Sequence, residues 1–160
     1  MCNSDLKEKA YQLAHDYDVK FGCCPQCVLA AVQETVGVVS DDLIRASHTF
    51  GGGGGLKGAG TCGALAGGLA ALGAKFGRDR ERFGKGRFLK SFQKGKELME
   101  RFEAEYQGYT CEHIQEKYTG KTYDMWDAEG IKEFKSSECG PKCADLTGKV
   151  AVWTLELLED

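Results

Sequence analysis

The chain has 160 residues, enough for a sizeable hydrophobic core, and we expect a single domain over residues 1–160. Its 24 acidic and 21 basic residues give a net charge of −3, so no basic excess predicts nucleic-acid binding. No apolar stretch is long enough to cross a bilayer, and residues 1–10 lack the apolar run of a secretory signal. We therefore expect no membrane association and a cytoplasmic location.

Cysteine is unusually frequent in this chain. It occurs eight times, at positions 2, 23, 24, 27, 62, 111, 139 and 143. In a reducing cytoplasm such a number favours metal binding, cluster binding or redox chemistry over a framework of disulfides.

The first third of the chain predicts three helices. Residues 4–20 form an apolar stripe with Ser4 as N-cap, and a short helix should follow Ser40. Between them, Pro25 suits the first position of a helix that continues to Val36. Cys24 and Cys27 thus form a CxxC pair at a helix start, which thiol oxidoreductases and metal sites both use.

A glycine-rich stretch, residues 50–77, is the most distinctive part of the sequence. Five consecutive glycines, residues 51–55, lead to Thr61, which suits an N-cap and would make Cys62 the first helical residue. The loop lacks the Lys-Ser/Thr of a phosphate-binding P-loop. The helix that follows, to Phe76, contains Gly67 and Gly68, which destabilise a helix unless another helix packs very close. We expect this helix to be central and buried, with its small residues packing inside one subunit or across a homodimer interface.

Residues 87–106 are amphipathic and predict a long helix with Phe88 and Phe92 facing inward. Thr110 should cap the next helix, which begins with Cys111. Residues 118–137 show the weakest pattern, with Trp126 as an expected packing residue.

The last helix should begin at Pro141, which places Cys143 in its first turn. Few segments alternate like strands. The predicted fold is therefore an all-α, single-domain bundle of about six helices, with a glycine-rich loop leading into a central buried helix.

Four cysteines share one predicted position: Cys24, Cys62, Cys111 and Cys143 each stand at the start of a different helix. Free N–H groups and the helix dipole favour a thiolate there. If these helix ends converge, four thiolates can hold an iron–sulfur cluster or a tetrahedral zinc ion, and pairs of them can cycle between dithiol and disulfide. The alternative is that several are simply buried thiols.

The glycine-rich stretch FGGGGGLKGAGTCGALAGGLAALGAKFG resembles the central signature of the redox-active proteins called the C-GCAxxG-C-C family. CPQCVLAAVQE, TCEHI and CADLTGKVAVWTLELLE resemble its other cysteine segments and carry Cys24, Cys111 and Cys143. The literal GCAxxG string is absent, because Thr61 and Gly63 flank the central cysteine.

Similar domains occur in split-Soret cytochromes, so the resemblance implies anaerobic electron transfer and an iron–sulfur centre. The cysteines at the family positions would be its ligands, with Cys27 and Cys139 as substitutes. No CxxCH motif is present, which argues against covalent c-type haem.

Three hypotheses follow. The first is a small electron-transfer protein with an iron–sulfur cluster of unknown nuclearity on Cys24, Cys62, Cys111 and Cys143, serving a redox partner protein. The second is a metal-free thiol–disulfide protein that uses Cys24 and Cys27. The third is a module held together by structural zinc. Whether the protein is an oxidoreductase or an electron carrier stays open.

Overall fold

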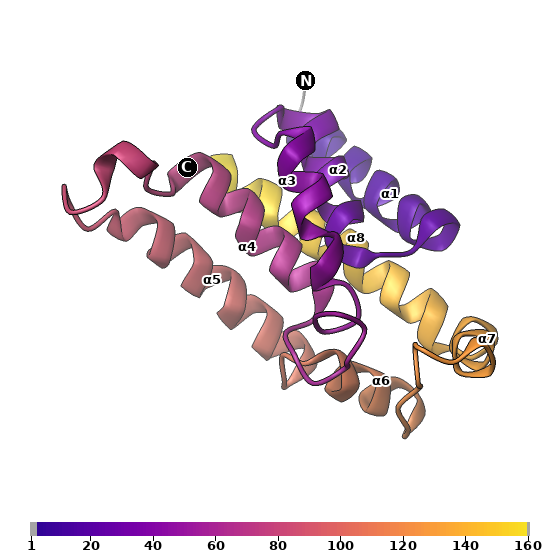
Figure 1. Ribbon diagram of the computed structural model, residues 1–160. Helices are drawn as coiled ribbons and strands as arrows, with labels where there is room; N and C mark the ends of the chain where they lie inside the picture. The colour runs from indigo at the N-terminus through magenta and orange to yellow at the C-terminus, as the bar shows by residue number, and fades with distance from the viewer. Residues whose placement is uncertain (1–2, 160) are drawn as a thin grey trace.

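The fold is known from a computed structural model that describes residues 3–159 (Figure 1). These residues form an all-α single domain, as expected, with eight α-helices and two short 3₁₀ helices. The elements are α1 (Asn3–Phe21), α2 (Cys24–Val36), α3 (Asp41–Ala46), η1 (Ser47–Phe50), α4 (Gly63–Phe76), η2 (Arg80–Arg82), α5 (Leu89–Tyr106), α6 (Cys111–Thr119), α7 (Ala128–Ser136) and α8 (Cys139–Glu159). The expected number of helices was too low, because α7 forms inside the weakly patterned stretch 118–137.

Helix α4 lies at the centre of the bundle and packs against α2, α5 and α8. Its glycines make this possible. A Cβ atom at Gly67 would lie 2.7 Å from the carbonyl oxygen of Pro25, and one at Gly68 would lie 2.6 Å from Oγ1 of Thr154. The close approach expected from these glycines is confirmed, and at both positions the neighbour belongs to the same chain.

Helix α8 joins the two sides of the bundle. It forms its largest contact with α1, where a Cβ at Gly148 would lie 2.6 Å from the ring of Tyr11. At its far end Glu156 pairs with Lys7 of α1 at 2.9 Å and with Arg101 of α5 at 2.6 Å. Burial alone would raise the pKa of Glu156, but hydrogen bonds from these two cations hold it below its ordinary value.

Two aromatic residues that we expected to pack inward are exposed. Phe92 is 72% exposed because the buried face of α5 runs through Lys94, Leu98 and Phe102. Phe92 precedes Lys94 by two residues, which places it on the opposite side of a helix. Trp126 is 75% exposed and donates a hydrogen bond from Nε1 to the carbonyl oxygen of Gly55 at 3.0 Å.

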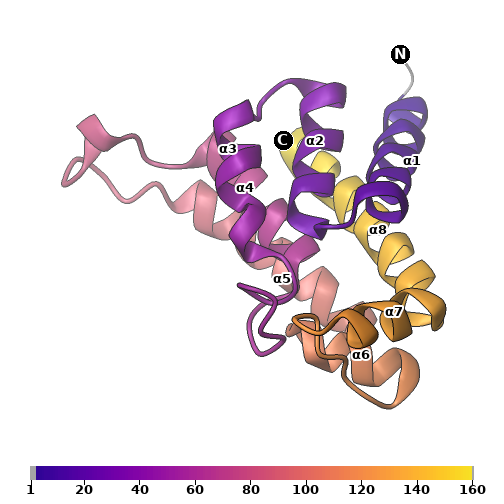
Figure 2. The same cartoon turned by 45° about the vertical axis from the view of Figure 1, so that its right-hand side comes forward.

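The two ends of the bundle differ. In Figures 1 and 2 the glycine loop, α6 and α7 gather at one end, whereas the connection between α4 and α5 projects from the other. Within residues 3–159 no helix combines the length and the apolar character needed to span a membrane. Cys2 lies outside the described residues.

Candidate functional site: a cysteine-lined pocket

A pocket of about 770 Å³ is lined in part by the glycine loop, together with residues of α6 and α7. Its wall includes residues from α1, α2, the glycine loop, α4, α6, α7 and α8. Five cysteines line it: Cys23, Cys24, Cys62, Cys111 and Cys143. The structure therefore brings the four cysteines predicted at helix starts to one pocket, together with one neighbour.

An isolated antiparallel bridge between Thr61 and Thr110 aligns the starts of α4 and α6. The N–H of Cys62 donates to the Tyr109 carbonyl at 2.6 Å, and the N–H of Cys111 donates to the Gly60 carbonyl at 3.0 Å. These two bonds fix both cysteine backbones side by side across the bridge.

The two Thr–Cys pairs do not have the same geometry. Thr110 caps α6, since its Oγ1 accepts a hydrogen bond from the N–H of His113 at 3.2 Å, as predicted. In α4 the N-cap is Cys62 itself, one residue later than expected for Thr61. The reason is that Thr61 has extended backbone in the bridge, so the helix begins only at Gly63.

The glycine loop forms one wall of the site. Gly53 has a φ of 78°, and a Cβ there would lie 2.9 Å from the Cβ of Cys111, so only glycine fits. Most N–H groups of the loop donate to carbonyls within it or just before it, such as Gly55 to Thr49 at 2.7 Å and Gly60 to Gly53 at 3.0 Å. The loop thus supports a cysteine, and few of its N–H groups remain to cradle a phosphate.

The CxxC pair divides between two environments. Cys24 begins α2 and lines the pocket. Cys27 is only 4% exposed, is not part of the pocket wall, and donates its S–H to the Gly22 carbonyl at 3.1 Å. Cys23 is the N-cap residue with a φ of 63° and also faces the pocket.

Helix α8 begins at Cys139, two residues before the expected start at Pro141. Pro141 is the third helical residue, where its missing N–H breaks no helical hydrogen bond, so the helix can start earlier. Cys143 consequently lies one turn inside the helix, and its Sγ is 3.9 Å from that of Cys139. The hydrogen bond between them lowers the pKa of Cys139 and raises that of Cys143.

The expectation that helix starts make these thiols acidic is wrong for the four predicted ligands. Burial raises the pKa of Cys62 to about 12 and that of Cys111 to about 11, and it also raises the pKa of Cys24. Backbone N–H groups of α4 lower the pKa of Cys62, but burial outweighs them. Without a cation in the pocket these thiols are protonated at neutral pH.

Two residues of the site were not found from the sequence. Asp18, on the last turn of α1, lines the pocket and accepts hydrogen bonds from Thr147 and from Cys24. Gln115 is 2% exposed and donates from Nε2 to the Sγ of Cys111 at 3.4 Å. The spacing Cys111–Gln115 places both on one face of α6, which is the one signal that could have identified Gln115.

The exposed part of the pocket lining is mainly apolar, although Lys20 and Lys135 also belong to it. Val19 and Phe21 of α1, Leu56 of the glycine loop and Trp126 all line the pocket and are at least 40% exposed. Such a rim is typical of a surface that excludes water around a buried centre or meets a partner.

Within the described part of the chain, no three Cys, His, Asp or Glu side chains stand close enough as they lie to hold a single metal ion. A tetrahedral zinc site needs its four sulfurs about 3.8 Å apart, given Zn–S bonds of about 2.3 Å. An iron–sulfur cluster distributes its thiolates over several iron atoms, so its ligands need not meet around one point.

Comparison with known protein families agrees with the resemblance. Residues 22–157 match the family model described as "Putative redox-active protein (C_GCAxxG_C_C)". No curated protein and no solved structure gives a significant match. The match extends over most of the chain and includes all four helix-start cysteines. The chain therefore belongs to the C-GCAxxG-C-C family of redox-active, cysteine-rich proteins.

Proposed function

We propose that this protein holds an iron–sulfur cluster on Cys24, Cys62, Cys111 and Cys143 and transfers electrons to a redox partner protein. One observation supports this above all: these four thiols, from the start of α2, the N-cap of α4, the start of α6 and the second turn of α8, line a single pocket. Four ligands from four helices give a rigid site, since each sulfur is held by a separate packed element.

The thiols of the pocket would have to lose their protons to bind iron. Burial disfavours every thiolate in the pocket, and the cysteines raise one another's pKa as well. Bound iron would offset this, because a cation next to the sulfur favours the deprotonated thiol. When bound, the cluster would supply one-electron transfer, for which neither thiols nor carboxylates are suited.

The residues around the thiols would tune the site. Gln115 donates to the sulfur of Cys111, which stabilises negative charge there. Asp18 acts in the opposite direction, because its carboxylate raises the pKa of Cys24. The exposed apolar rim would exclude water and receive the redox partner.

The proposal is tested by substituting each pocket cysteine in turn. After reconstitution with iron and sulfide under anaerobic conditions, iron per chain is measured by chemical analysis. We expect Cys24→Ser, Cys62→Ser, Cys111→Ser and Cys143→Ser each to lower the bound iron at least severalfold. Cys27→Ser is the matched control, because Cys27 is also buried near the start of α2 but is not part of the pocket wall. Equal iron in the four variants and the control would contradict the proposed ligands.

A further inference from the structure

The two cysteines at the start of α8 are arranged for a bond with each other. Their Sγ atoms are 3.9 Å apart and belong to residues four positions apart in one helix. Helix geometry places the Cα atoms of such residues about 6.2 Å apart. Disulfides span Cα separations of about 4.4–6.8 Å but need Cβ atoms about 3.5–4.5 Å apart, closer than the about 5–6 Å of helix residues four positions apart. The bond therefore requires the first turn of α8 to tighten as the two sulfurs approach by about 2 Å.

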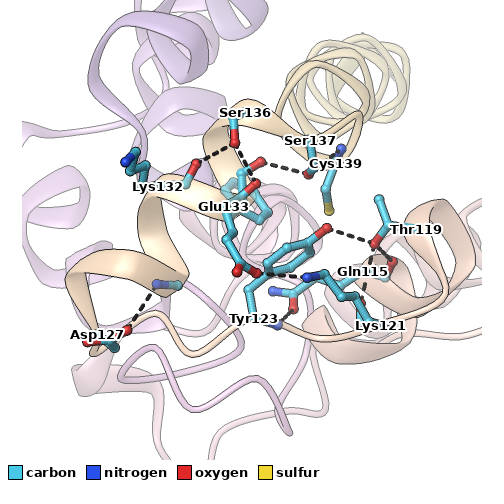
Figure 3. A network of polar contacts seen from close by, with 12 residues as sticks. Gln115, Thr119, Lys121, Tyr123, Asp127, Lys132, Glu133, Ser136, Ser137 and Cys139 are labelled. Atoms are coloured by element: carbon cyan, nitrogen blue, oxygen red, sulfur yellow. Dashed lines mark hydrogen bonds and ion pairs between the residues drawn. The ribbon is translucent and has the colours of Figure 1, made fainter.

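The two thiols differ in access. Cys143 is partly exposed and lines the pocket, whereas Cys139 is completely buried and is not part of the pocket wall. Figure 3 shows Cys139 where α7 leads into α8, with its N–H donating to the Oγ of Ser137 at 3.1 Å. A molecule that enters the pocket can therefore reach Cys143, and Cys139 lies behind it, with its Sγ 3.9 Å from that of Cys143.

We propose that Cys139 and Cys143 are a dithiol–disulfide site that reacts with small-molecule disulfides entering the cysteine-lined pocket. Cys143 is the accessible thiol and Cys139 is the resolving thiol. This pair differs from the CxxC pair of α2, in which Cys27 points to the Gly22 carbonyl instead of the pocket.

The exchange has two steps. The thiol of Cys143 first gives its proton to water, and the resulting thiolate attacks one sulfur of the small disulfide, whose S–S bond breaks and releases one small thiol. The deprotonated sulfur of Cys139 then attacks the Sγ of Cys143 and releases the second small thiol. Two protons and two electrons have moved from the protein to the two small thiols, and one protein disulfide has formed.

The reaction would also control the proposed cofactor, and this consequence alone rests on the proposed function. A Cys143 that is bonded to Cys139 has no free sulfur for iron. Oxidised protein should therefore take up less iron than reduced protein, and a reductant should restore the uptake.

The test uses metal-free full-length protein and glutathione disulfide, with a chelator present and oxygen excluded. Remaining thiols are alkylated after unfolding, and the protein is digested with trypsin. Cleavage after Lys135, Lys142 and Lys149 separates the two cysteines, so peptides 136–142 and 143–149 stay together only through the disulfide. We expect this linked pair in the mass spectrum and a fall from eight alkylated cysteines to six.

Three variants test the assigned roles. Cys27→Ser should still give the linked peptides, because Cys27 takes no part. Cys139→Ser should stop at the first step and keep glutathione on Cys143, whereas Cys143→Ser should leave Cys139 unmodified because it is buried.

The wild-type mapping decides the question even if a variant does not fold. A linkage of Cys143 to Cys24, Cys62 or Cys111, or glutathione retained on wild-type Cys143, would overturn the proposal. No step of this peptide mapping involves iron. The mapping therefore tests the disulfide proposal alone, and the iron analysis of the cysteine variants tests the cluster proposal.

Discussion

Replacing Gly67 by alanine tests the packing that positions the site. The new methyl group would lie 2.7 Å from the carbonyl oxygen of Pro25 and 2.9 Å from its Cα. Both are backbone atoms at the start of α2, so no side chain can rotate away. The start of α2, which carries Cys24, must then shift relative to α4.

The magnitude follows from two opposing terms. Overpacking typically destabilises a protein by about 1–3 kcal/mol, and contact with rigid backbone argues for the upper part of that range. Alanine also stabilises a helix by about 1 kcal/mol relative to glycine. We therefore expect Gly67→Ala to lower the free energy of unfolding by about 2 kcal/mol.

Gly73→Ala is the matched control in the same helix, because a Cβ at Gly73 meets no atom within 4 Å. This variant should gain up to about 1 kcal/mol from helix propensity. Urea unfolding followed by circular dichroism measures the stability of both variants. With a slope of about 2 kcal/mol/M, the urea midpoint of Gly67→Ala should fall below that of wild type and the midpoint of Gly73→Ala should rise above it, with about 1 M or more between the two variants. A Gly67→Ala protein as stable as Gly73→Ala would refute the close contact of α4 with α2.

Three further predictions concern charge, the sulfur environment and the surface. Glu156→Gln should lower the free energy of unfolding by about 1 kcal/mol at neutral pH, since its ion pairs are partly exposed. The pKa of Glu156 in the folded protein is lowered, so the stability difference between wild type and variant should shrink as the pH falls below the ordinary value of 4.5 and vanish below the folded-state pKa. Urea unfolding at several pH values measures this difference. A difference that stays constant with pH would count against the ion pairs. Gln115→Leu removes the donor that lowers the pKa of Cys111, so alkylation of Cys111 in metal-free protein should become slower at a given pH, and a faster reaction would argue against that hydrogen bond. Phe92→Ser should change stability by less than about 0.5 kcal/mol, whereas Phe102→Ala should cost about 3–5 kcal/mol; comparable losses in thermal unfolding would mean that α5 packs differently.

Local patterns predicted much of this fold. The capping residue Thr110, the helix start at Cys24 and the glycines of α4 each depend on chemistry within a few residues. Such signals are present in the sequence itself, so most helices and the central position of α4 could be predicted.

The remaining features depend on contacts between distant segments. The bridge between Thr61 and Thr110 delays the start of α4 by one residue, and nothing near Thr61 indicates it. The burial that raises the pKa of Cys62 likewise results from the assembled bundle. Asp18 is held at the pocket by Thr147 of α8, which donates to its carboxylate at 3.3 Å from 129 residues further along the chain, a contact that no local pattern indicates.

The proposed cluster is tested most directly by an absorption spectrum with iron, sulfide and zinc analysis on protein purified without oxygen. We expect broad absorbance in the visible region, with iron and sulfide in whole-number ratio to the chain, both lost in Cys62→Ser and kept in Cys27→Ser. A colourless protein with one zinc per chain would contradict the proposal and indicate a structural metal. A protein that takes up neither metal would also contradict it, leaving the thiols of the pocket to act by disulfide exchange alone.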